Sequence, residues 1–134
     1  MRRGGERKLP MQYMLLIYHS EAQASAMSKA DMAAQLDAYQ AYTNRLVSAG
    51  VLRAGDALEP TTTATTVRVR GAETMTVDGP FAETKEQLGG YYLIEVDNLD
   101  EALKWAAELP ESKTGSVEVR PVMNLTAHER DVRG

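Results

Sequence analysis

The sequence contains no cysteine among its 134 residues, and this absence excludes several kinds of chemistry. Without a thiol the chain forms no disulfide, has no thiolate nucleophile and supplies no sulfur ligand to a zinc or iron–sulfur site. Histidine is also scarce, since His19 and His128 are the only two. A metal site would therefore depend on carboxylates alone, and we predict no metal and no cofactor.

Long hydrophobic runs and an excess of positive charge are missing too. The longest apolar runs, at 14–18 and 91–94, are too short to cross a bilayer, and residues 1–10 have no apolar segment like that of a signal peptide. We therefore expect a cytoplasmic protein that binds no membrane. The formal net charge is −4, which argues against binding to a phosphate backbone, so we expect no nucleic acid as a partner. Gly89 and Gly90 lack the following helix and lysine of a phosphate loop, and no nucleotide is implied.

The composition fits one domain. Of all residues 43% are apolar, which is enough for one core in a chain of this length. Residues 1–10 combine basic side chains with glycines and predict a disordered extension, with a basic arm for nucleic acid as the alternative. Residues 126–134 have no periodic apolar pattern and predict a flexible tail. The domain is expected at residues 11–125.

The apolar pattern changes its period along this domain. A nearly continuous apolar run at 13–19 predicts a strand that is buried on both faces. A helical period then begins after Ser28, which with Asp31 resembles a capping box, and ends at Gly50. A second helix is expected from Asp100 to Pro110. Further strands are expected at 51–58, 65–70, 74–77, 90–96 and 117–122.

The order of these elements predicts the fold class. It reads βαββαβ with an inserted hairpin in the central sheet, which is a ferredoxin-like α+β arrangement with two helices on one face of an antiparallel sheet. The first strand nevertheless offers apolar side chains to both faces, for example Leu15 and Leu16. A second copy packed sheet to sheet would bury the bare face and give a homodimeric α+β barrel. Coverage by long loops is the alternative.

One segment carries a family resemblance. Residues 78–90 read Asp-Gly-Pro-Phe-Ala-Glu-Thr-Lys-Glu-Gln-Leu-Gly-Gly and resemble the signature of the DGPF family, which is similar to the wider YCII-related group. The strand at 13–18 and the ending Glu-Val-Arg-Pro-Val at 118–122 are similar to that family as well. The resemblance covers about residues 11–124 and implies a ferredoxin-like dimeric barrel. Some DGPF members resemble partners encoded beside extracytoplasmic-function sigma factors. YCII relatives look like small-molecule enzymes, including a dehydrochlorinase that acts on a halogenated muconate-type acid.

The resemblance also implies a catalytic histidine and aspartate. Asp78 matches the aspartate before the Pro-Phe pair and inherits the role of acid or base. The family's helix-one histidine corresponds to Tyr39 in this chain, so the pair is broken. His19, at the end of the first strand, is the candidate replacement because an imidazole titrates near neutral pH. The alternative for Asp78 is a hydrogen bond within its own turn, which Gly79 and Pro80 favour.

Ligand-binding candidates lie in and near the signature. Lys85, beside Glu83, offers a cation for a carboxylate-bearing ligand, and a solvated charged loop is the alternative. Arg120 lies in a short apolar strand and needs an acidic partner from the signature or an anionic ligand. Phe81 is either a core residue or part of a ligand site. Tyr39 belongs to a group of tyrosines that form either an aromatic pocket wall or core.

Two functions from different classes follow. The first is an enzyme of acid–base proton transfer on an organic acid, with Asp78 and His19 as catalytic residues and Arg120 or Lys85 holding the carboxylate. The second is a non-catalytic ligand-binding or regulatory module that works with an extracytoplasmic-function sigma factor. The expected partners are a second copy, a small anionic ligand and, for the second function, the sigma factor. The fold alone does not decide between them.

Overall fold

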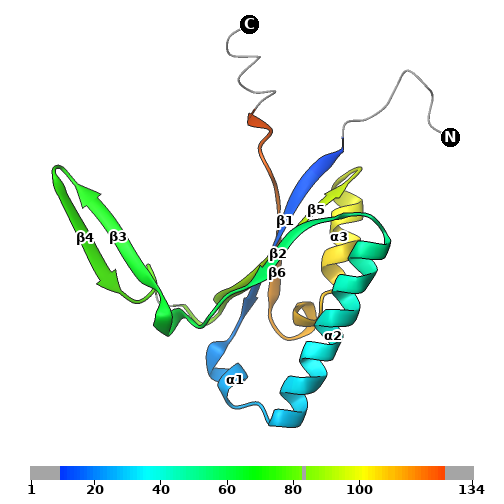
Figure 1. Ribbon diagram of the computed structural model, residues 1–134, viewed down its shortest axis with the longest axis horizontal. Helices are drawn as coiled ribbons and strands as arrows, with labels where there is room; N and C mark the ends of the chain where they lie inside the picture. Colours follow the sequence, from blue (N-terminus) through cyan, green and yellow to red (C-terminus); the bar gives the residue numbers. More distant parts are fainter. Residues whose placement is uncertain (1–9, 83, 126–134) are drawn as a thin grey trace, which may run out of the picture.

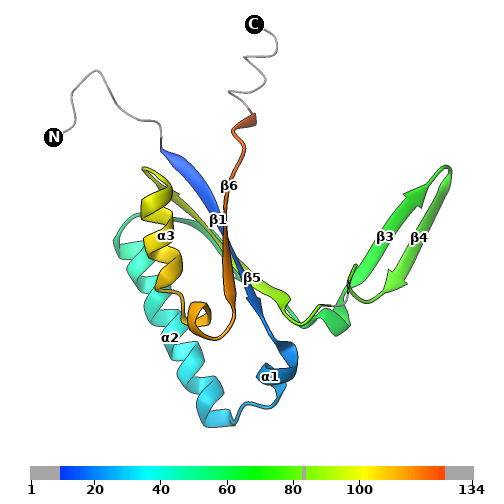
Figure 2. The ribbon, with the colours of Figure 1, turned by 180° about the vertical axis from the view of Figure 1, so that it is seen from behind.

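The computed structural model describes residues 10–82 and 84–125. Helices lie along one side of a four-stranded antiparallel sheet, and a separate hairpin projects on the opposite side (Figure 1; Figure 2). The sheet has the strand order β2-β5-β1-β6. Its strands are β1 (Met11–His19), β2 (Leu52–Ala57), β5 (Gln87–Val96) and β6 (Ser116–Pro121). The predicted α+β class is confirmed.

Helices and short 3₁₀ turns connect the strands. They are α1 (Glu21–Ser25), α2 (Lys29–Ser48), α3 (Leu99–Ala107), η1 (Thr61–Thr63) and η2 (Pro110–Lys113). α2 begins where the sequence predicts, because the Ser28 hydroxyl accepts a hydrogen bond from the Asp31 backbone N–H at 3.0 Å. The pattern does not predict α1, since five residues are too few to show a period. No helix in the described residues is long and apolar enough to cross a membrane.

The core lies between the sheet and the helices α2 and α3. Every second residue of β1 points toward the helices, and Tyr13, Leu15 and Ile17 are buried there. The buried core residues are Tyr13, Leu15, Ile17, Tyr42, Leu46, Ile94, Val96, Ala102, Ala106 and Leu109. Removing this apolar surface from water is the main driving force for folding.

The opposite face of the sheet carries no helix in the described part of the chain. Met14, Leu16 and Tyr18 of β1 point to this side and are only half-buried. Met14 lies between Leu93 of β5 and Arg120 of β6. We call this surface the open face. The described residues of one copy therefore do not bury β1 on both faces, and its burial by a second copy stays a prediction.

The hairpin is a two-stranded sheet of its own, formed by β3 (Thr65–Arg70) and β4 (Glu73–Asp78). Gly71 makes its turn with a φ of +62°, a conformation that favours glycine. Val67 and Val77 are 58% and 60% exposed. The prediction that this hairpin joins the central sheet is wrong, because a β-branched alternating pattern indicates a strand but not the strand that it pairs with.

Candidate functional site

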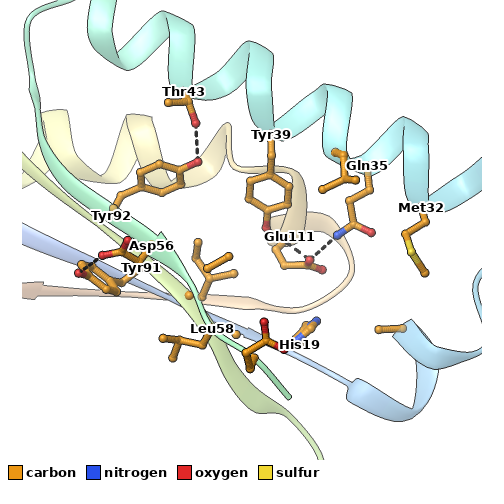
Figure 3. A pocket seen from close by; sticks show the side chains of 18 of the residues that line it. His19, Met32, Gln35, Tyr39, Thr43, Asp56, Leu58, Tyr91, Tyr92 and Glu111 are labelled. Carbon is orange, nitrogen blue, oxygen red and sulfur yellow. Dashed lines mark hydrogen bonds between the residues drawn. The ribbon is translucent and has the colours of Figure 1, made fainter. Parts of the chain in front are cut away.

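A cavity of about 790 Å³ lies between α2 and the sheet (Figure 3). Its apolar and aromatic lining residues include Ile17, Met27, Met32, Leu36, Tyr39, Leu52, Leu58, Tyr91 and Tyr92. Its polar lining residues are His19, Gln35, Thr43, Asp56, Glu59 and Glu111. A largely apolar wall with a few polar groups is typical of small-molecule sites, whose volumes are roughly 300–1,000 Å³.

His19 faces this cavity because the alternation of β1 puts it on the same side as Tyr13, Leu15 and Ile17. An irregularity in the neighbouring strand β5 makes room for its ring. The register between β1 and β5 shifts after Ile17, which pairs with Gly90, whereas Tyr18 pairs with Leu88. Gly89 is the extra residue of a bulge in β5, while β1 keeps an unbroken register with β6. The His19 ring lies where a side chain at residue 89 would begin, since a Cβ there would be 2.6 Å from its Nε2 atom. The missing side chain of Gly89 therefore makes room for the imidazole.

Glu111 supplies a buried carboxylate to the same cavity. This η2 residue is 7% exposed. Its Oε1 accepts hydrogen bonds from Gln35 Nε2 at 2.6 Å and the Tyr39 hydroxyl at 3.4 Å, as Figure 3 shows. Its Oε2 accepts one from the Thr114 hydroxyl at 3.0 Å. Burial, together with the charge of Glu111, raises the pKa of Tyr39, so this hydroxyl remains a donor at neutral pH.

Two further hydrogen bonds fix tyrosines of the cavity wall. The hydroxyls of Thr43 and Tyr92 share a hydrogen bond of 2.7 Å, which ties α2 to β5. The Tyr91 hydroxyl donates to Asp56 Oδ2 at 2.6 Å, and this bond raises the pKa of Tyr91. The register with β1 puts Tyr92 on the side of α2, beside Leu15, and Tyr91 on the open face, beside Leu16. The Thr43 contact therefore holds the Tyr92 ring in the cavity wall before any ligand arrives.

Beside the cavity, Glu21 joins α1 to η1. Its carboxylate accepts hydrogen bonds from the Thr61 hydroxyl at 2.6 Å and the Thr61 backbone N–H at 2.9 Å. The hydroxyl bond is the main reason that the pKa of Glu21 is lowered, and the electrostatic interaction with His19 lowers it a little further. This contact holds the segment after β2 against the end of β1, where His19 lies.

Comparison with known proteins assigns the family. The sequence model of the YCII-related domain matches residues 11–126. The chain belongs to the YCII-related family. A protein of Rhizobium meliloti (strain 1021), described as uncharacterized, is 46% identical over 114 residues, which cover 84% of this chain and 92% of the relative. The resemblance seen in the sequence is confirmed at the level of the YCII-related family.

The structure of this YCII-related chain places some of the predicted site residues in the cavity and others outside it. His19 and Tyr39 line the same cavity. Asp78 is an exposed residue at the end of β4 in the projecting hairpin and is not among the described lining residues. Within the described residues its carboxylate makes no hydrogen bond, and the turn is instead held by the Gly79 N–H, which donates to the Ala64 carbonyl at 2.6 Å.

The predicted anion-binding residues lie outside the cavity. Arg120 points to the open face and is paired with Glu118 two residues away on β6, with its Nε atom 2.9 Å from Oε2. Arg120 is paired with Glu118 rather than with a described residue of the signature segment, because period-two spacing puts Glu118 on the same face of the strand. Lys85 is exposed and borders a second, polar hollow of about 510 Å³ together with Gln23. Glu83 lies outside the described residues.

Phe81 is not part of the core. Its side chain is 75% exposed, and the Arg68 guanidinium lies 4.9 Å from the centre of its ring. The prediction of a core residue is therefore wrong, and the ring forms a cation–π contact with the hairpin instead. Among the described residues no group of three or more histidine or acidic side chains is placed to hold a metal ion.

Proposed function

We propose that this chain binds a small, largely apolar organic molecule in the cavity between α2 and the sheet, and that His19 exchanges a proton with it. The observation that carries the proposal is the position of His19 in the wall of a cavity of about 790 Å³. Imidazole is the side chain best suited to proton transfer near neutral pH. The apolar wall supplies binding, and the fixed polar groups supply orientation.

The arrangement favours a site over a packing defect. The bulge at Gly89 leaves space for the His19 ring, and bulges of this kind are common beside active sites. The polar end of the cavity is preformed, since Gln35 and Tyr39 already donate to Glu111. Preformed polar groups cost little to organise when a ligand binds.

Proton transfer is measured by deuterium exchange. Mixtures of small organic molecules are incubated with the protein in D₂O, and the loss of carbon-bound protons is followed by ¹H NMR. We expect exchange on at least one molecule that binds, and we expect His19→Gln to slow it about a hundredfold or more, as for loss of a general acid or base. Glutamine retains polarity and volume, so binding should persist.

The same assay separates catalysis from binding. Asp78→Asn, a substitution on the projecting hairpin, tests whether the aspartate of the family pair takes part. If Asp78→Asn slows exchange as strongly as His19→Gln, the aspartate acts with His19 in an assembly of two copies. If molecules bind in the cavity and the wild-type protein exchanges none of their protons, the chain is a binding module and the catalytic part of the proposal is wrong.

For the assembly we propose a ferredoxin-like homodimer closed through the open face. Two observations support it. Met14, Leu16 and Tyr18 form an apolar strip that α2 and α3 do not cover, and the hairpin extends on the same side of the sheet, beyond the body of one copy (Figure 2). A two-fold contact would bury both surfaces at once. The hairpin of one copy would then lie against its partner.

A further inference from the structure

We infer that the ligand of the cavity is an organic cation, such as an amine with an apolar body, whose charged group lies against Glu111. This inference rests on the proposed function, because it assumes that the cavity binds a small molecule. It differs from the expectation drawn from the sequence, in which the ligand is an organic acid held by Arg120 or Lys85. Both of those residues lie outside the cavity.

The charges on the cavity wall favour a cation. Glu111 places a buried carboxylate in the cavity, and Glu59 is a second acidic lining residue. Asp56 instead turns its carboxylate to Tyr91 on the open face. Among the described lining residues there is no lysine or arginine. His19 is the one described basic side chain in the wall. Charges interact more strongly in a partly enclosed, apolar space than in water. An anion would therefore be repelled, and a cation would be attracted.

Among the described residues, Glu111 in particular has no lysine or arginine as a partner. Its described hydrogen-bond donors are an amide and two hydroxyls, from Gln35, Tyr39 and Thr114, and no ion pair joins it to a lysine or arginine among the described residues. Buried carboxylates are normally paired with a cation. A carboxylate has about four acceptor positions, so an ammonium group has room to donate to it.

The rest of the wall suits the body of such a ligand. The Tyr39 side chain lines the cavity with its hydroxyl on the Glu111 carboxylate (Figure 3), so an aromatic residue adjoins the place proposed for the cation, as in other cation sites. Met32 and Leu36 line the cavity from α2, and Leu58 lines it from the segment after β2. An amine with a hydrocarbon or aromatic body would place its charge at Glu111 and its apolar part among these side chains.

Three probes with the same phenyl ring, similar size and different charge test the inference: benzylammonium, benzyl alcohol and benzoate. Binding is followed by NMR on protein whose methionine methyl groups carry ¹³C, because Met27 and Met32 line the cavity and report occupation of this site. We expect benzylammonium to bind about tenfold more tightly than benzyl alcohol, as for a charge-assisted hydrogen bond. Benzoate is expected to bind most weakly.

Variants assign the preference to Glu111. Glu111→Gln keeps a hydrogen-bond acceptor and removes the charge, so the affinities for benzylammonium and benzyl alcohol should become similar. Glu108→Gln is the matched control, because it removes the same charge from an exposed residue of the α3 C-terminus that pairs with Arg45. It should leave the tenfold preference intact.

The outcomes separate this inference from the proposed function. If benzoate or benzyl alcohol binds the wild-type protein as tightly as benzylammonium, the inference is wrong while the cavity remains a small-molecule site. That comparison needs no variant, so it stands even if Glu111→Gln fails to fold. If no probe shifts the signals of Met27 or Met32, the proposed function itself is contradicted, and the inference is lost with it.

Discussion

At the scale of single residues, the contact between Gly89 and His19 makes a direct prediction. A methyl group at residue 89 would come 2.6 Å from Nε2 of His19, so Gly89→Ala forces the ring out of its place. The contacting atoms are the far end of a side chain that can turn away, so we expect a loss of about 0.5–1.5 kcal/mol in the free energy of unfolding, as for a side chain pushed off its preferred rotamer. Denaturant unfolding measures it.

A second substitution controls for backbone effects of the alanine. If the methyl group acts through the imidazole, most of the loss should disappear in the double variant that also carries His19→Ala, because the two residues are in contact. Additive losses in the single and double variants would show that the ring does not occupy the position described.

The buried hydroxyl of Tyr39 predicts a pH dependence. Its pKa is raised, first by burial and then by Glu111, so it loses its proton more readily in the unfolded chain than in the folded one. The stability that this provides is present below the ordinary tyrosine pKa and is lost as the pH rises from about 10 toward the folded value. Tyr39→Phe should reduce this loss by up to about 1.4 kcal/mol per pH unit.

The measurement is urea unfolding of both proteins between about pH 8 and about pH 11. Tyr42, whose pKa burial also raises, titrates in the same direction and continues to contribute in the Tyr39→Phe variant. Parallel stability curves for the wild-type protein and the variant would mean that Tyr39 is not buried beside Glu111.

Residue chemistry predicts part of the site. The sequence predicts His19 and Tyr39 as site residues, because the chemistry of an imidazole and of a phenol suggests a role whatever the fold around them. Glu111 does not, since its burial depends on η2 packing against α2, and its partner Gln35 is 76 residues away in the chain. The only feature of the sequence that marks Glu111 is its position directly after Pro110. The apolar pattern uses Pro110 only to predict where the second helix ends. The contacts of Arg120 are also not predictable from the sequence alone. They depend on which face of β6 the helices cover, and Arg120 lies on the face that they do not cover.

At the scale of elements, periodicity predicts the helices and strands better than their pairing. The expected strand at 65–70 and the Ser28 cap agree with β3 and α2. Pairing depends on contacts far apart in the chain, so the pattern does not show that β3 and β4 form their own sheet. The bulge at Gly89 is equally hidden, because a single skipped residue alters the register without altering the composition.

At the scale of the whole molecule, the open face predicts the assembly. Leu16 lies on this face, and Leu16→Lys would place a charge in the proposed dimer contact, where an unpaired cation is costly. We expect a wild-type dimer and a monomeric variant in sedimentation equilibrium. Val47→Lys is the control, because Val47 is already 59% exposed on α2. A wild-type protein that is monomeric at all concentrations would contradict the dimer.

The central claim, a functional cavity with His19 as its proton-transfer group, is tested most directly by the deuterium exchange rate of a bound molecule with and without the imidazole. The account predicts exchange by the wild-type protein and about a hundredfold less with His19→Gln, while the methyl signals of Met27 and Met32 still report binding. Equal exchange rates for the two proteins, with the molecule bound in the cavity, would contradict it.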